Sequence, residues 1–80
     1  MNFEDMPPQA QTALMDVAYN HGDSGARTLG RGAFWSRVTN GDYAGAAAAL
    51  RAEAPHQRGE NARRLLEDAD LLEQAVPHHP

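Results

Sequence analysis

The stretch from Met6 to Asn20 constrains the fold most, because its small and apolar residues recur at the three- and four-residue spacing of one helix face. The residues on this face are Ala10, Ala13, Leu14, Val17 and Ala18. Pro7 and Pro8 suit the first turn of a helix, and Asp5 is expected to cap that turn. Gly22 is expected to end the helix, because glycine readily adopts the left-handed conformation found after many helices.

A glycine-rich loop and a short helix are expected next. Residues 21 to 32 hold four of the seven glycines, a composition typical of loops. A helix from about 33 to 39 would place Phe34, Trp35 and Val38 on one side of the chain. Because adjacent residues on a helix face different directions, Phe34 and Trp35 permit two interpretations. Either both fill a small core, or one of them is exposed as an interface anchor.

The third helix is predicted from 43 to 54, after a break at Gly41. Asp42 is well placed to cap it, since its side chain can accept a hydrogen bond from a backbone N–H of the first turn. The helix contains the run Ala46–Ala49, and alanine is the strongest helix former. Its small side chains also allow a neighbouring helix to approach closely. Pro55 is expected to end the helix or to open a turn.

The last helix is predicted from about 57 or 59 to 75. Its apolar seam consists of Leu65, Ala69, Leu72 and Val76. Residues 77 to 80 contain two prolines and are expected to form a frayed tail. The patterns together predict an all-α fold, a small bundle of about four helices in which residues 1 to 80 form one helical domain.

The composition limits the classes of partner. Eleven acidic and seven basic residues give a net charge of −4, which speaks against nucleic-acid binding and suits either simple solubility or a host protein with a basic surface. An 80-residue chain buries a small core, so a partner or a homodimer would add stability. The absence of cysteine fits a reducing cytoplasm, and no long apolar run predicts a membrane span.

Three motifs occur in an informative order. They are Ala13-Leu14 with Ala18-Tyr19-Asn20 and Gly22, then Asn40-Gly41-Asp42-Tyr43, then Arg63-Arg64 with Glu67. In this order the motifs resemble the C-terminal helical lobe of phage-type lysozymes and pesticin-like muramidases, over about residues 6 to 73. The resemblance implies that Arg63 anchors the lobe by bonding to carbonyls of a neighbouring loop. The plain interpretation of Arg63, Arg64 and Glu67 is an ion pair within one helix.

The resemblance also implies which catalytic groups to look for, namely a glutamate on a helix upstream of the lobe and an Asp–Thr hairpin. This chain starts almost at the lobe itself, so it is expected to lack the catalytic N-terminal part. Asp23 and Thr28 echo the hairpin, but their spacing is one residue short and they follow the helix that they should precede. Glu4, beside Asp5, is expected to stay ionised in solvent, which is unsuitable for a general acid. The sequence therefore favours a protein without catalytic residues of its own.

Two surfaces are candidates for binding a partner. Trp35 is flanked by Arg31 and Arg37, and tryptophan and arginine are enriched at binding hot spots. An acidic run on the last helix is either a solvated face or a docking surface for a basic partner. Its members are Glu67, Asp68, Asp70 and Glu73.

Two functions remain open from the sequence. The first is a non-catalytic binding protein of a phage or mobile element, acting in the bacterial cytoplasm as an inhibitor of a host complex, for example of the anti-CRISPR type. The second is a lobe or subunit of a muramidase, with Tyr19, Asn20 and Trp35 lining a cleft for peptidoglycan sugar. No cofactor and no metal are expected, since neither the pair His21 and Asp23 nor the tail histidines His78 and His79 make a closed site.

Overall fold

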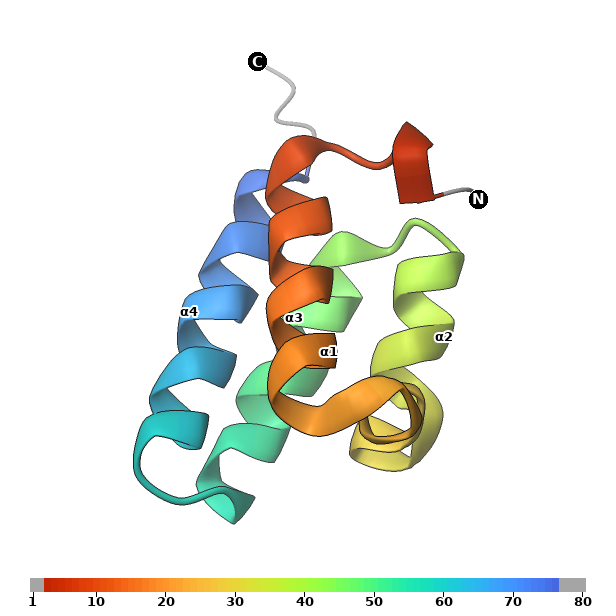
Figure 1. Cartoon of the computed structure of the whole chain (residues 1–80). Helices are drawn as coiled ribbons and strands as arrows, with labels where there is room; N and C mark the ends of the chain where they lie inside the picture. The colour runs from red at the N-terminus through yellow and green to blue at the C-terminus, as the bar shows by residue number, and fades with distance from the viewer. Residues whose placement is uncertain (1–2, 77–80) are drawn as a thin grey trace.

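The computed structural model describes residues 3 to 76, apart from the side chain of Asp23, and every regular element in this range is helical. The four α-helices are α1 (Pro8–Thr28), α2 (Ala33–Thr39), α3 (Tyr43–Glu53) and α4 (Glu60–Gln74) (Figure 1). Single 3₁₀ turns, η1 (Phe3–Asp5), η2 (Leu29–Gly32) and η3 (Ala54–His56), precede or join them. The predicted all-α fold is confirmed. The predicted tail with His78 and His79 lies outside the described residues.

The first helix is longer than predicted. Gly22 has φ 74° and ψ 167°, so it interrupts α1 as expected, but the chain then resumes a helical path to Thr28. The prediction of a loop at 21 to 32 was therefore wrong. Ala26 and Leu29 are buried, and their packing holds this segment as one further helical turn and a 3₁₀ turn. Gly22, Gly30 and Gly32 have positive φ angles, so the chain can change direction there between short helical segments.

The start of α1 also differs from the prediction. The capping position is occupied by Pro7, and no side chain caps the helix there. Asp5 lies in η1 instead, one turn too early to reach the free N–H groups of α1. The side chain of Gln11 fixes the entry of the chain, because its Nε2 donates to the carbonyl oxygen of Met6 at 2.9 Å.

The other helix boundaries follow the sequence closely. Asp42 caps α3 as predicted, and its Oδ1 accepts a hydrogen bond from the backbone N–H of Gly45 at 2.9 Å. α2 spans the predicted residues, and Pro55 falls in η3 just after α3. These agreements arise because each boundary depends on local backbone chemistry.

The core lies where α4 packs against α1 and α3, with α2 closing the side next to α3. Its largest fully buried side chains are Phe34, Leu50, Leu65, Leu72, Val17 and Val38. Ala46 and Ala47 are completely buried, and their small side chains let α3 come close to its neighbours. The predicted seam of α4 is buried at Leu65, Ala69 and Leu72 and partly buried at Val76. Within residues 3 to 76, no helix is long and apolar enough to cross a membrane.

Candidate functional site

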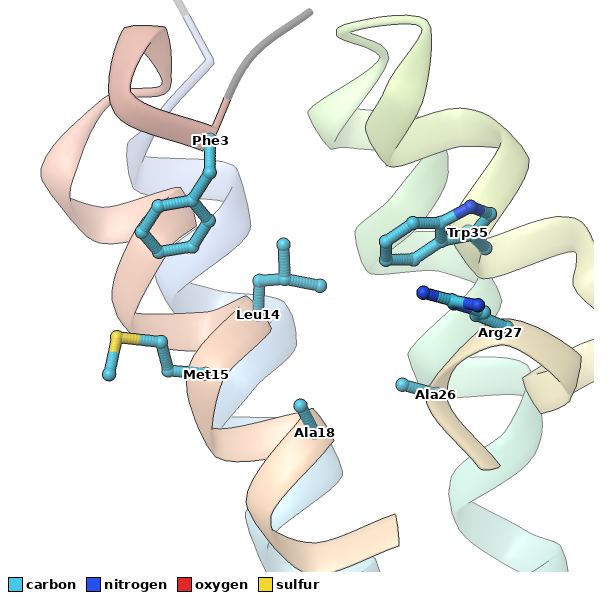
Figure 2. A pocket seen from close by; sticks show the side chains of 7 residues that line it. All are labelled: Phe3, Leu14, Met15, Ala18, Ala26, Arg27 and Trp35. Carbon is cyan, nitrogen blue, oxygen red and sulfur yellow. The ribbon is translucent and has the colours of Figure 1, made fainter. Parts of the chain in front are cut away.

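An open apolar groove of about 230 Å³ lies between the first part of α1 and the chain that follows Gly22. We call it the Trp35 groove. One wall consists of Phe3, Leu14, Met15 and Ala18, and the other of Ala26, Arg27 and Trp35 (Figure 2). The walls face each other because the chain turns at Gly22 and α2 then runs back beside α1 (Figure 1).

Trp35 and Arg27 contact each other on one wall of this groove, and Arg27 is the charged residue that lines it. The guanidinium carbon of Arg27 lies 5.6 Å from the centroid of the Trp35 ring, within the range of a cation–π contact (Figure 2). Phe34 is fully buried whereas Trp35 is only partly buried. Phe34 thus fills the core, whereas Trp35 packs against the core and also lines the groove, which lies between the two interpretations of this pair.

The outward face of α1 beside the groove is uncharged and exposes two large side chains. Met15 is 62% exposed and Tyr19, one turn later, is 85% exposed. Between Pro8 and Asn20 the helix has a single charged residue, Asp16, and this residue faces α4. Large apolar side chains grouped next to a groove are typical of surfaces that bind other molecules.

The predicted group of Trp35, Arg31 and Arg37 is not brought together. Arg37 pairs with Asp42 at 3.1 Å and so supports the cap of α3. Arg31 is exposed in η2 at φ 60°, an unusual conformation for a residue with a side chain, and lines a different hollow. Arg27 lines the groove in their place. It was missed because it falls in the segment that its glycines predicted to be a loop.

The acidic residues of α4 are largely balanced by neighbouring arginines. Arg51 of α3 pairs with Asp70 at 2.9 Å and also with Glu73, and it lowers the pKa of the Glu73 carboxyl. Glu67 pairs with Arg63 at 3.7 Å within the helix, as predicted for these positions. The exposed carboxylates predicted as a docking surface therefore already have partners within the molecule.

Asp68 is the exception among the four acidic residues, and its predicted exposure was wrong. Only 3% of its surface is exposed, because it lies on the side of α4 that also carries Leu65 and Leu72. Its Oδ2 has no hydrogen-bond partner among residues 3 to 76 as the structure describes them. Burial, together with the contact to the carboxyl of Asp16, raises the pKa of the Asp68 carboxyl to about 8. We therefore expect Asp68 to carry a proton at neutral pH.

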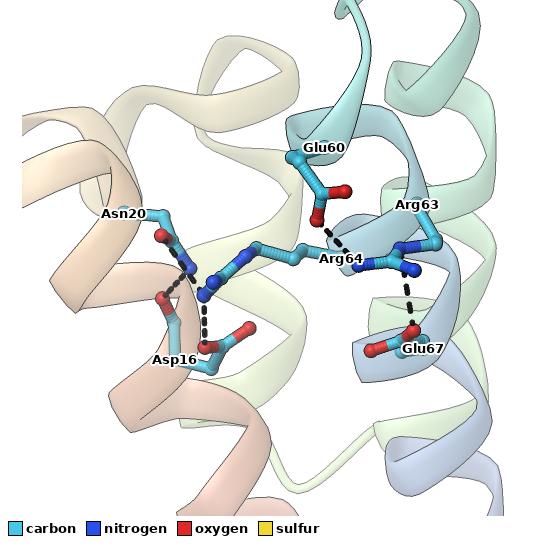
Figure 3. A network of polar contacts seen from close by, with 6 residues as sticks. All are labelled: Asp16, Asn20, Glu60, Arg63, Arg64 and Glu67. Carbon is cyan, nitrogen blue, oxygen red and sulfur yellow. Dashed lines mark hydrogen bonds and ion pairs between the residues drawn. The ribbon is translucent and has the colours of Figure 1, made fainter.

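A polar network beside Asp68 joins α1 to α4. Arg64 Nη1 lies 3.4 Å from Asp16 Oδ1 and 3.3 Å from Asn20 Oδ1 (Figure 3). Asn20 Nδ2 donates to the backbone carbonyl of Asp16 at 2.8 Å. Arg63 lies outside this network and contacts Glu60 and Glu67 at the surface. The bridging contacts between helices are therefore made by Arg64, whereas the resemblance assigned an anchoring role to Arg63.

Of the three residues predicted to hold a sugar, only Trp35 lines the groove. Asn20 takes part in the network with Arg64, and Tyr19 projects into solvent from α1. Neither of them lines the groove that contains Trp35.

Neither a metal-binding cluster among the described residues nor a similar protein was found for this chain. In the part of the chain that the structure describes, no group of three or more histidine, aspartate or glutamate residues could hold a metal ion. The chain matches no protein-family model, no curated protein and no solved structure. The lysozyme-like lobe therefore stays a prediction from the motifs, and the site must be interpreted from its own geometry.

Proposed function

We propose that this chain is a non-catalytic binding protein that holds a partner protein in the Trp35 groove. The observation that carries the proposal is the uncharged, exposed face of α1, with Met15 and Tyr19 beside an open apolar groove. Aromatic residues, methionine and arginine are the residue types enriched at protein interfaces, and all of them meet here. Burying Met15 and Tyr19 under a partner would remove large apolar surfaces from water, which favours association.

In its finer form, the proposal is an inhibitor of a host protein complex, encoded by a phage or mobile element and acting in the bacterial cytoplasm. The small size of the chain and its net charge of −4 support this form, because they suit a compact protein that meets a host surface rich in basic residues. The alternative of a muramidase lobe has less support, since Tyr19, Asn20 and Trp35 do not share a cleft.

The test is capture of partners from a bacterial lysate by three matched proteins: the wild type, Met15→Glu and Leu66→Glu. Both side chains are exposed, at 62% and 45%, so neither substitution disturbs the core. Leu66 lies on α4, outside the groove, and serves as the control. We expect one protein to be captured in stoichiometric amount by the wild type and by Leu66→Glu but lost from Met15→Glu. Equal capture by all three proteins would contradict binding at the groove.

A further inference from the structure

Arg27 lines the Trp35 groove and has no ion pair with the side chains that the structure describes. Four of the seven arginines, namely Arg37, Arg51, Arg63 and Arg64, form ion pairs with carboxylates. Among the described side chains, no carboxylate pairs with Arg27, although the chain contains eleven acidic residues. Arg31 and Arg58 also lack such a pair, but neither lines the Trp35 groove.

The position of Arg27 prepares it to bind an anion. Its guanidinium lies over the ring of Trp35, so the indole covers part of one face (Figure 2). Among the described residues, no carboxylate pairs with the N–H donors at its edge. A guanidinium offers its donors in a planar fork that matches the two oxygens of a carboxylate. Stacking on the ring also limits the freedom of the side chain, which reduces the entropy lost when an ion pair forms.

The groove beside Arg27 suits a ligand that also carries an apolar group. Leu14, Met15, Ala18 and Ala26 line it with apolar side chains and offer no charged group. An ion pair at the edge of such a surface is less screened by water than one on an open polar surface. A ligand that fits must therefore carry a large apolar group and a carboxylate close together.

We propose that the partner inserts a large apolar side chain into the Trp35 groove and pairs an aspartate or glutamate, within about one helical turn of it, with Arg27. This inference rests on the proposed function and specifies the chemistry of its partner. The surrounding charge of the chain is negative, so Arg27 provides the local attraction that an acidic residue of the partner needs here. The pairing thereby determines the register in which the partner segment lies along the groove.

The experiment selects binders from a displayed library of random 12-residue peptides on the wild type, on Arg27→Glu and on Met15→Glu. Arg27 is exposed, so its replacement leaves the core intact; circular dichroism verifies the fold of each variant. On the wild type we expect peptides in which an apolar residue lies within four positions of an aspartate or glutamate. On Arg27→Glu we expect these peptides to be lost and peptides with lysine or arginine at the same position to be enriched.

The strongest wild-type peptide is then synthesised with its acidic residue and with the matching amide. We expect the amide to raise Kd about tenfold, because a hydrogen-bonded charge pair is lost. Peptides that depend on Met15 but show no acidic residue, or that bind Arg27→Glu equally well, would overturn the inference and leave the proposed function standing. If no enriched peptide depends on Met15, the groove is not a binding site and both proposals fail.

Discussion

The helices α1 and α4 lie side by side, yet their outward faces have opposite characters (Figure 1). The face of α1 is uncharged and exposes Met15 and Tyr19. The face of α4 carries Glu60, Arg63, Glu67, Asp70 and Glu73, each of which has an ion-pair partner. A charge that is already paired adds little to the free energy of association, because its own ion pair must first be broken. Covering exposed apolar surface, in contrast, favours association. On the proposed function, the partner therefore binds at α1, and the paired charges of α4 stay in contact with water.

The largest expected effect comes from the buried side of α4. Leu65 is 1% exposed, while its neighbour Leu66 is 45% exposed. We expect Leu65→Ala to lower the free energy of unfolding by about 2–5 kcal/mol, because it leaves a cavity between helices. Leu66→Ala, the matched control, should change it by less than about 0.5 kcal/mol. Urea denaturation measures both, and equal losses would mean that the two faces of α4 have been assigned incorrectly.

A smaller effect is expected from the buried carboxyl between the two helices. The pKa of Asp68 is raised to about 8 from an ordinary value of 3.8, so the folded state holds a proton that the unfolded state has released between these pH values. Stability from this group is therefore full below about pH 4 and is lost as the pH rises through about 8. Asp68→Asn keeps the shape and cannot ionise, so we expect it to exceed the wild type in stability by about 1–3 kcal/mol at high pH.

Urea denaturation of the wild type and Asp68→Asn across pH 4 to 9 tests this prediction. The difference between the two proteins is the informative quantity, because it removes the contribution of all other titrating groups. The groups that face Asp68 are Asp16 of α1 and, on its own helix, Glu67 and Arg64. A difference that stays constant over this range would show that Asp68 is ionised in the folded protein.

The ion pairs on the face of α4 should contribute less than either buried group. Arg51→Met removes the partner of Asp70 and Glu73, so we expect a slight decrease in melting temperature. The decrease should shrink at a salt concentration of about 1 M, where exposed charges are screened. Arg58→Met is the control, because Arg58 is exposed and has no ion pair among the described residues. A large decrease that persists at high salt would contradict the view of this face as merely solvated.

The smallest effect on stability is expected on the outward face of α1. Met15→Glu and Tyr19→Lys should each change the free energy of unfolding by less than about 0.5 kcal/mol, since both side chains are exposed. Their effect belongs to partner binding instead. Thermal melts of the two variants check the prediction, and a marked loss of stability would mean that this face contributes to folding.

Much of the fold follows from local chemistry. The bounds of α2 and the cap at Asp42 were predicted correctly, because each depends on a few neighbouring residues. The helical turn after Gly22 was not predicted, since only the burial of Ala26 and Leu29 holds it against its glycine content. That error also hid Arg27, and with it one wall of the groove. For the same reason Trp35 was grouped with Arg31 and Arg37, whereas the structure places Arg27 over its ring.

The burial of Asp68 shows a different limit of the sequence. An acidic residue among three others is normally solvated, and this expectation holds for Glu67, Asp70 and Glu73. The four-residue spacing from Asp68 to Leu72 was the available signal, because it places both on one face of α4. Asp68 was predicted to be exposed because it is acidic, and its position on the helix was given less weight. Its burial results from the packing of α4 against α1 and α3.

The turn at Gly22 has a consequence for how such a protein can change over generations. Because the chain turns at Gly22 and α2 runs back beside α1, every residue of the Trp35 groove lies within the first 35 positions. The ion pairs that do not involve α1 lie between positions 37 and 73. Under the proposed function, we therefore expect substitutions that alter the partner to fall in one stretch of the sequence, apart from most of the ion pairs. In descendants that meet new partners, we expect positions 3, 15 and 27 to diverge faster than the charged positions of α4.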